Sequence, residues 1–180
     1  DFIPRAILTY KPGDGSTVYA SYSYSSLLGV ATQARFINSV APSVIPASAL
    51  DAIGDYTKPQ ENTQYEIGWK KQGDRWNATL AAFYMDWKNQ PFAAVIQLVP
   101  AGTSSFRGPG DSRYRGFEFE GNYQATNWLL LGGQIGYVDS KMVSFSSRGS
   151  EEQLVLRSGN LSVVADGNPI RSNPELTGSF

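Results

Sequence analysis

Apolar and polar residues alternate with a period of two along much of this 180-residue chain. The alternation comes in runs of about ten residues, separated by clusters of glycine, proline, asparagine and serine. Because successive side chains of a β-strand point to opposite faces, each run predicts a strand with one apolar and one polar face. We expect strands at residues 3–11, 17–26, 60–71, 74–89, 113–125, 129–140 and 172–180.

The predicted connections alternate between short and long. The short ones are residues 12–16, 72–73 and 126–128, and the long ones are 27–59, 90–112 and 141–171. An up-and-down membrane barrel has this rhythm, because its periplasmic turns are short and its extracellular loops are long. A soluble β-sandwich offers no reason for it. The sequence therefore predicts an all-β fold, an antiparallel up-and-down transmembrane β-barrel.

The predicted hairpins sort their residues by face, because residues paired across antiparallel strands point the same way. On the apolar face, the expected pairs are Tyr10–Val18, Leu8–Ala20, Trp69–Trp76, Ile67–Ala78, Tyr65–Leu80, Tyr123–Leu131, Phe119–Ile135 and Phe117–Tyr137. On the polar face, they include Glu120–Gln134 and Glu118–Gly136. We expect lipid contact at Leu80, Phe119, Leu131 and Ile135, and lumen exposure at Glu66, Glu118, Glu120 and Gln134.

Aromatic residues lie near both ends of the apolar faces. Trp69, Trp76, Tyr123 and Tyr10 lie near the short turns, and Tyr22, Tyr24, Tyr84 and Tyr137 lie near the long loops. The eight residues from Trp76 to Tyr84 span roughly 20 Å at about 3.3 Å per residue and a tilt near 40°, close to the apolar band of ~25 Å in membrane barrels. Tyr and Trp suit both edges of that band, since their rings are apolar with one polar atom. This spacing favours a membrane barrel over a soluble sheet.

Composition narrows the functions that the chain can carry. With 15 basic and 16 acidic residues, the charge is balanced, so we expect no nucleic-acid partner. The absence of cysteine and histidine excludes a disulfide framework, a thiolate zinc site and a Cys or His nucleophile system within this stretch. We expect no catalytic residues, no metal site and no cofactor. Glu118 and Glu120 could suggest paired-carboxylate glycoside chemistry, but we interpret them as lumen carboxylates that meet water, Lys70 or arginines of a plug.

Four motifs in order carry a family resemblance. Residues 18–23 (VYASYS) resemble the "vYasYs" strand of TonB-dependent receptors, and residues 61–70 (ENTQYEIGWK) resemble their "E-x-x-x-x-Y-E-x-G-x-K" strand. Residues 77–90 (NATLAAFYMDWKNQ) are similar to "n-a-a-x-F-y-x-d-y-x-n-q", and residues 114–121 (YRGFEFEG) to "x-x-G-x-E-x-E". Residues 167–174 resemble the "G-x-x-x-P-x-x-P" entry to a later strand.

The resemblance implies a 22-stranded barrel that is closed by an N-terminal plug domain. We expect residues 1–180 to be part of such a barrel domain, about seven strands of it, without the plug, the TonB box or the closing strands. The implied function is import of a scarce nutrient, such as a siderophore or another large solute, across the outer membrane of a Gram-negative bacterium. Its implied partners are the TonB–ExbB–ExbD complex, acting through the plug, and a small-molecule ligand. The alternative is a passive, porin-like channel.

Two sets of residues are candidates for binding. Arg35, Tyr56, Phe106 and Arg107 lie in predicted long loops, where ligand contacts of the resembling family occur. Arg113 and Arg115 are expected to face outward near the long-loop end, where they could bind lipopolysaccharide phosphates. Their other interpretation is ordinary solvated charge at a strand end. The ligand stays open among siderophores, vitamin-like complexes, saccharides and aromatic compounds.

Overall fold

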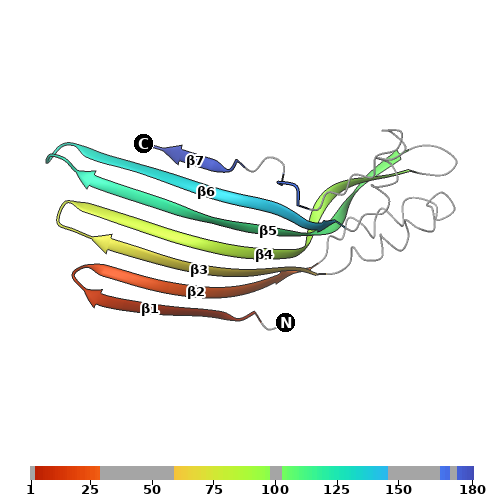
Figure 1. The fold of residues 1–180 in the computed structure, drawn as a ribbon, viewed down its shortest axis with the longest axis horizontal. Coiled ribbons are helices and arrows are strands. Elements are labelled where there is room, and N and C mark those ends of the chain that lie inside the picture. The colour runs from red at the N-terminus through yellow and green to blue at the C-terminus, as the bar shows by residue number, and fades with distance from the viewer. Residues whose placement is uncertain (1–2, 29–58, 98–102, 146–166, 171–173) are drawn as a thin grey trace.

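The computed structural model describes residues 3–28, 59–97, 103–145, 167–170 and 174–180 as one antiparallel sheet. Its strands are β1 (Arg5–Gly13), β2 (Ser16–Leu27), β3 (Gln60–Gln72), β4 (Trp76–Gln97), β5 (Thr103–Gln124), β6 (Leu130–Phe145) and β7 (Leu176–Ser179). Each strand pairs with its neighbours in sequence, in the order β1 to β7 (Figure 1). Within the described ranges, no helix is long and apolar enough to cross a membrane. The predicted all-β, antiparallel fold class is confirmed.

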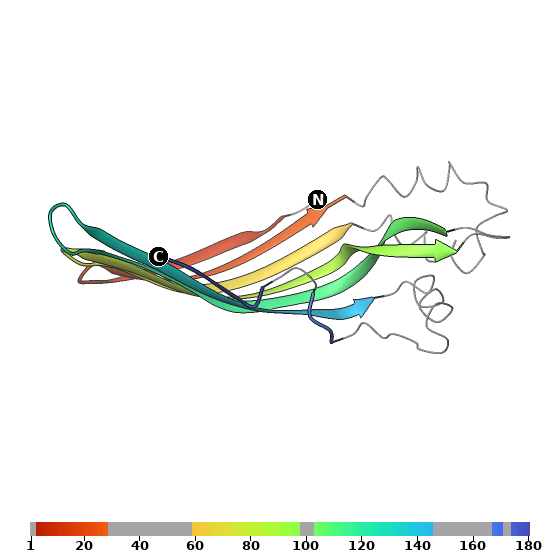
Figure 2. The same cartoon turned by 90° about the horizontal axis from the view of Figure 1, so that it is seen from above.

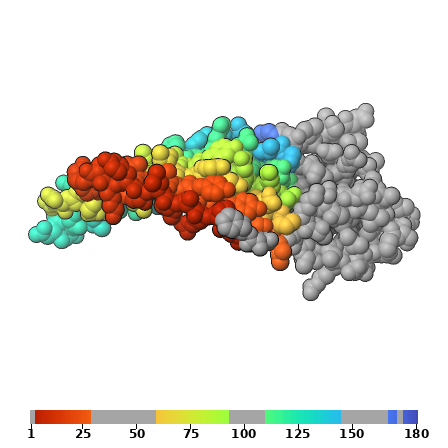
Figure 3. Space-filling model, turned by 90° about the horizontal axis from the view of Figure 1, so that it is seen from below, coloured from red at the N-terminus to blue at the C-terminus, as the bar shows by residue number. Residues whose placement is uncertain are grey.

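The sheet is curved and twisted, and it does not close within this segment (Figure 2). Among the described strands, β1 and β7 have a neighbour on one side only. All nine residues of β1 are exposed, and β1 (red) lies in front in Figure 3, which views the sheet from this edge. An unpaired strand edge leaves backbone N–H and C=O groups without partners, which is costly in lipid. In the described part of the chain, β1 and β7 are therefore the two open edges of the sheet.

The predicted register is confirmed in two hairpins. Tyr10 pairs with Val18 and Leu8 with Ala20 in the first hairpin. In the β5–β6 hairpin, Phe119 pairs with Ile135, and the Ala125 N–H donates to the Leu129 carbonyl at 2.9 Å, which closes the expected three-residue turn.

The predicted partners across β3 and β4 are wrong, although the predicted faces are right. Trp69 pairs with Leu80, Ile67 with Ala82 and Tyr65 with Tyr84. The turn is centred on Asp74 and Arg75 instead of residues 72–73, and the Gly73 N–H donates to the Trp76 carbonyl at 2.8 Å. Arg75 in this turn donates to the backbone carbonyls of Gln124 and Ala125, both at 3.0 Å. A contact with the next hairpin thus stabilises this turn, and moving the turn by two residues changes every partner but no face.

The prediction of a long loop over residues 90–112 is wrong for most of that range. Strands β4 and β5 contain 22 residues each and stay paired from Gln90↔Gly110 to Gln97↔Thr103. This extended hairpin bends away from the rest of the sheet (Figures 1 and 2). The register shifts between Trp87 and Gln90, where Asn89 has a φ of 54°. Pro91 and Pro109, which suggested a loop, lie opposite each other just beyond this β-bulge.

The apolar face of the sheet lacks a protein cover in the described structure. Mid-strand side chains stay well exposed, namely Leu80 (44%), Phe119 (41%), Ile135 (44%) and Leu131 (53%). An uncovered apolar surface of this extent in water is unfavourable. Among the described residues, the largest fully buried side chain is that of Ser112, a polar residue. The sheet therefore requires an apolar medium on one side, in agreement with the predicted lipid face.

Candidate functional site: the lumen face and the rim of the sheet

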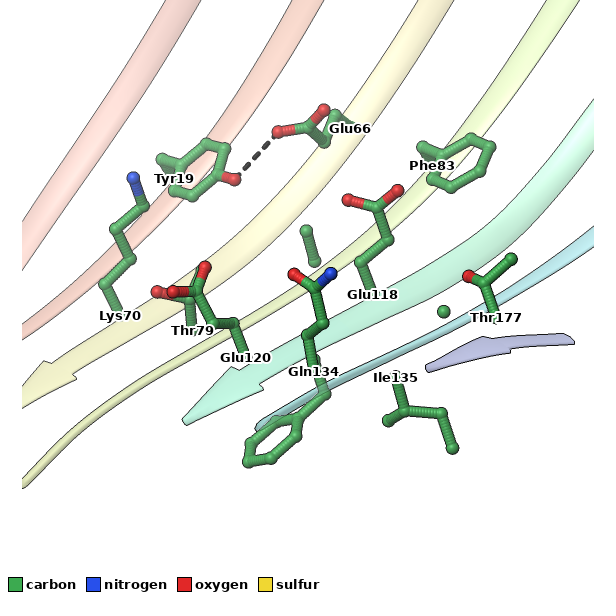
Figure 4. A pocket seen from close by; sticks show the side chains of 13 residues that line it. Tyr19, Glu66, Lys70, Thr79, Phe83, Glu118, Glu120, Gln134, Ile135 and Thr177 are labelled. Atoms are coloured by element: carbon green, nitrogen blue, oxygen red, sulfur yellow. Dashed lines mark hydrogen bonds between the residues drawn. The ribbon is translucent and has the colours of Figure 1, made fainter. Parts of the chain in front are cut away.

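The polar face carries a hollow of about 310 Å³ that crosses β2 to β7. The register brings its side chains together, because Tyr19, Gly68, Ala81, Glu118, Gly136 and Thr177 pair in one row across the sheet. The next row contains Lys70, Thr79, Glu120 and Gln134. Figure 4 shows Gln134 on this side of the ribbon and Ile135 on the other. The predicted lumen residues Glu66, Glu118, Glu120 and Gln134 thus lie on one face and line one hollow.

Tyr19 organises the hollow. Its hydroxyl donates to Glu66 Oε1 at 2.7 Å (Figure 4). Gln64 Nε2 donates to Glu66 Oε2 at 3.4 Å. The Tyr19 ring lies over Gly68, where a Cβ atom would overlap the ring. Lys70 Nζ lies 5.5 Å from the centre of the same ring. A glycine is therefore required at position 68 for the tyrosine to reach Glu66.

The three carboxylates of the hollow have no ion pair with a cation among the residues that the structure describes. The Lys70 ammonium, which we expected as a partner, lies against the Tyr19 ring instead. No group of three or more His, Cys, Asp or Glu side chains within the described ranges could hold a metal ion. The hollow is therefore acidic, and its carboxylates have capacity for further hydrogen bonds or cations.

A rim cluster, defined as Asn89, Gln90, Asp111, Ser112 and Tyr114, lies where the extended hairpin bends. The Asn89 N–H donates to Asp111 Oδ1 at 3.1 Å, and Asn89 Nδ2 donates to the Pro59 carbonyl at 2.9 Å. The Ser112 hydroxyl donates to Gln90 Oε1, and Gln90 Nε2 lies 3.0 Å from the Tyr114 hydroxyl. Ser144 on β6 donates to Asp111 Oδ2 at 3.2 Å. These bonds connect β4, β5 and β6 at the bend, and they reach Pro59, the residue before β3.

An outer cation cluster, defined as Arg113, Arg115 and Lys141 with Asp86 and Asp139, lies on the apolar-face side at the same end. Arg113 Nε donates to Asp86 Oδ1 at 3.0 Å, and the Arg113 guanidinium lies 5.5 Å from the centre of the Tyr84 ring. Arg115 Nε donates to Asp139 Oδ2 at 2.9 Å, and Lys141 Nζ lies 3.6 Å from the same oxygen. Arg113 and Arg115 therefore lie at the expected position, and their lipid contact stays a prediction.

The four loop candidates have separate outcomes. Arg35 and Tyr56 lie outside the described residues. Phe106 and Arg107 lie on β5, where their backbones pair with Ala94 and Ala93. They belong to the extended hairpin instead of a loop. Ligand binding by all four stays a prediction.

The sequence pattern did not predict the rim cluster, nor that Lys141 and Asp139 belong to the outer cation cluster. The sequence does contain a signal for Asp139 and Lys141. The outward-facing residues Ile135 and Tyr137 recur at every second position, and this period continues directly to Asp139 and Lys141. The rim cluster had no clear signal, since its bonds join residues up to 33 positions apart and depend on the β-bulge at Asn89.

Aromatic side chains contact one another on the outward face, next to the outer cation cluster on the side of the short turns. Tyr22 and Tyr65 lie with ring centres 5.3 Å apart, Tyr65 pairs with Tyr84, and Phe117 stacks on Tyr137 at 5.8 Å. An uncovered apolar face, an aromatic border and a polar opposite face define the wall of a transmembrane β-barrel.

The comparisons with known proteins identify the kind of barrel. The family model described as "TonB dependent receptor-like, beta-barrel" matches residues 1–180, so the chain belongs to this family. Members of the family are transport receptors of the Gram-negative outer membrane, not enzymes.

The individual proteins that this chain resembles have low sequence identity to it, and the matches cover only part of each chain. The metal-pseudopaline receptor CntO of Pseudomonas aeruginosa, in strains UCBPP-PA14 and PAO1, is 30% identical over 99 residues, which are 54% of this chain and 13% of the receptor. The structure of the copper transporter OprC aligns with a TM-score of 0.59 and 18% identity over 81% of this chain and 21% of that chain. The closed form of the ferric-catecholate import receptor Fiu from K12 E. coli aligns with a TM-score of 0.49 and 21% identity over 81% of this chain and 20% of that chain. This chain thus corresponds to about an eighth to a fifth of these proteins, and OprC supports the fold alone.

Proposed function

We propose that this chain forms part of the barrel wall of an outer-membrane receptor that imports a scarce, large solute, such as a siderophore, by an energy-coupled mechanism. The observation that carries the proposal is the family match over residues 1–180, on a sheet whose two faces are sorted between lipid and lumen. The name of the CntO receptor, a metal-pseudopaline receptor, supports a metal complex within that class of solutes.

The acidic lumen wall is consistent with a plugged barrel. Glu66, Glu118 and Glu120 line one hollow and have no ion pair among the described residues. Carboxylates attract cationic partners by Coulomb interaction. A plug domain with arginines at this level would provide them, and the TonB–ExbB–ExbD complex would act on that plug from the inner membrane.

Uptake with and without an uncoupler tests the proposal against a passive channel. A plugged barrel offers no open diffusion path, so work must be done on the plug, and the outer membrane contains no ATP. With the full-length receptor in cells, we expect the uncoupler to abolish internalisation of a radiolabelled ferric siderophore while surface binding persists. A strain without TonB is the matched control and should behave like the uncoupled cells. Internalisation that follows the concentration gradient and ignores the uncoupler would support the passive channel and remove the receptor proposal.

A further inference from the structure

The outer cation cluster lies at the outer border of the apolar band. Along the outward face of β4, ten residues separate Trp76 from Asp86, which corresponds to roughly 25 Å at a tilt near 40°, the full height of the band. Asp86 pairs with Arg113, and Arg113 pairs with Lys141, so the cluster lies at that level across three strands. Phe117 and Tyr137 lie one pair further toward the membrane centre than Arg115 and Asp139. Charge on a lipid face is tolerated at this border, where headgroups begin.

The cluster has an excess of positive charge. Three cations face two carboxylates, which leaves a net charge of +1. Asp139 Oδ2 accepts from both Nε and Nη2 of Arg115, at 2.9 and 2.8 Å, so this carboxylate is directed mainly at Arg115. Lys141 Nζ is 3.6 Å away, longer than a strong charge-assisted hydrogen bond. The ammonium of Lys141 is therefore only weakly neutralised.

The cluster is also hollow and open. Arg113, Arg115, Asp139 and Lys141 line a space of about 180 Å³. The side chains of Arg113, Arg115 and Lys141 are exposed by 46%, 60% and 50%. Arg115 and Lys141 thus line the same open space. The space is therefore an accessible site for an anion.

We propose that the outer cation cluster binds a phosphate group of an outer-leaflet lipid, with Arg115 and Lys141 as its main donors, and that this phosphate competes with the Asp139 carboxylate for them. Guanidinium and ammonium groups bind phosphate through short, charge-assisted hydrogen bonds. The bound molecule is a lipid and not free phosphate, because the site opens on the same side as Phe117 and Phe119, along which the acyl chains of that lipid would lie. In a Gram-negative outer membrane, the lipid that carries such phosphates in the outer leaflet is lipopolysaccharide.

Lipid retention by the full-length receptor in detergent tests this proposal. The probes are phosphorylated lipid A, dephosphorylated lipid A and inorganic phosphate, and native mass spectrometry counts the bound lipid. We expect Lys141→Gln to lower the apparent affinity for phosphorylated lipid A about three- to tenfold. Lys11→Gln is the matched control, because it removes the same charge from an exposed lysine of β1 near a short turn. It should bind lipid as the unmodified receptor does.

For a second variant, we expect the opposite change in affinity for phosphorylated lipid A. Asp139→Asn removes the carboxylate that competes with a phosphate, so we expect it to raise the affinity for phosphorylated lipid A, an effect that misfolding could not produce. Dephosphorylated lipid A should not be retained above the level of a neutral detergent. Equal binding by Lys141→Gln and Lys11→Gln, or weaker binding by Asp139→Asn, would overturn the proposal. Displacement of the lipid by millimolar inorganic phosphate would overturn the lipid as the ligand in favour of free phosphate.

Discussion

The part of the sheet between the short turns and Tyr84 is built differently from the rim at Asn89. In the spanning part, side chains are sorted by alternation, the apolar face is uncovered and the described side chains include few buried polar groups. At the rim, Ser112 and Ser140 are 1% and 4% exposed, and hydrogen bonds join β4, β5 and β6 to one another and to Pro59. Lipid supplies the apolar environment of the spanning part, so alternation suffices there. Beyond the membrane, the chain must satisfy its own buried polar groups.

A charge placed on the lipid face of the spanning part should give the largest effect. Ile135→Arg places a guanidinium against lipid near the middle of β6, and we expect it to destabilise the folded barrel by about 2–4 kcal/mol. Gln134→Arg is the matched control on the neighbouring residue, which faces the hollow with Glu120, and it should be mild. Denaturant titration of the full barrel in vesicles measures both. Equal destabilisation by the two variants would show that the assigned faces are wrong.

A side chain at Gly68 should have an intermediate effect within the lumen face. In Gly68→Ala, the new Cβ would overlap the Tyr19 ring, so the tyrosine must move and lose its bond to Glu66. We expect a cost of about 1–2 kcal/mol, because the ring can relax at one end.

A double-mutant cycle isolates that contact. Tyr19→Ala removes the ring, so Gly68→Ala should cost much less in that background than in the unmodified receptor. Additive effects of the two substitutions would mean that the ring does not limit the size of residue 68.

Two substitutions of Asn89, in the β-bulge at the rim, should separate the contribution of backbone strain to stability from that of hydrogen bonding. Asn89 has a φ of 54°, which glycine adopts freely and alanine does not. Asn89→Gly loses the bond to the Pro59 carbonyl but keeps the backbone, whereas Asn89→Ala loses the bond and adds strain. We expect Asn89→Ala to be the less stable variant by about 1 kcal/mol. Amide hydrogen exchange in the extended hairpin, residues 90–97 and 103–110, measures how far its backbone pairing weakens. Equal exchange in both variants would contradict a strained bulge.

The smallest effect is expected at the short turn between β1 and β2, which lies in water. The hydrogen bond from Lys71 lowers the pKa of Asp14 below its ordinary value of 3.8. A carboxyl whose pKa is lowered in the folded state stabilises that state above its unfolded pKa, and the contribution is lost as the pH falls through the lowered pKa. We expect a small stability difference between the unmodified receptor and Asp14→Asn at neutral pH that disappears in acid. A difference that persists unchanged below the lowered pKa would contradict the assigned pair.

The faces of the strands could be predicted from the sequence. Period-two alternation placed Leu80 and Ile135 outside and Glu118 and Gln134 inside, and this holds even where the β3–β4 partners were wrong. The reason is parity: a turn that moves by two residues changes partners by an even number and leaves every face unchanged. The family and fold class follow from the same alternation and from the motifs on it.

Only the tertiary structure decided the features that depend on neighbouring strands. Arg75 binds the backbone of the next hairpin, which moves the β3–β4 turn to a position that its own residues do not specify. The extended hairpin pairs through Pro91 and Pro109, whose local tendency is to end strands, because the bulge at Asn89 restores a register in which the strands continue. Three further features also depend on contacts between residues distant in sequence. They are the Tyr19 ring over Gly68, the hydrogen bonds to Asp111, and the pairing of Arg115 with Asp139 that leaves Lys141 weakly neutralised. Local pattern determines which side of a strand a residue faces, and the packing of strands determines what it meets there.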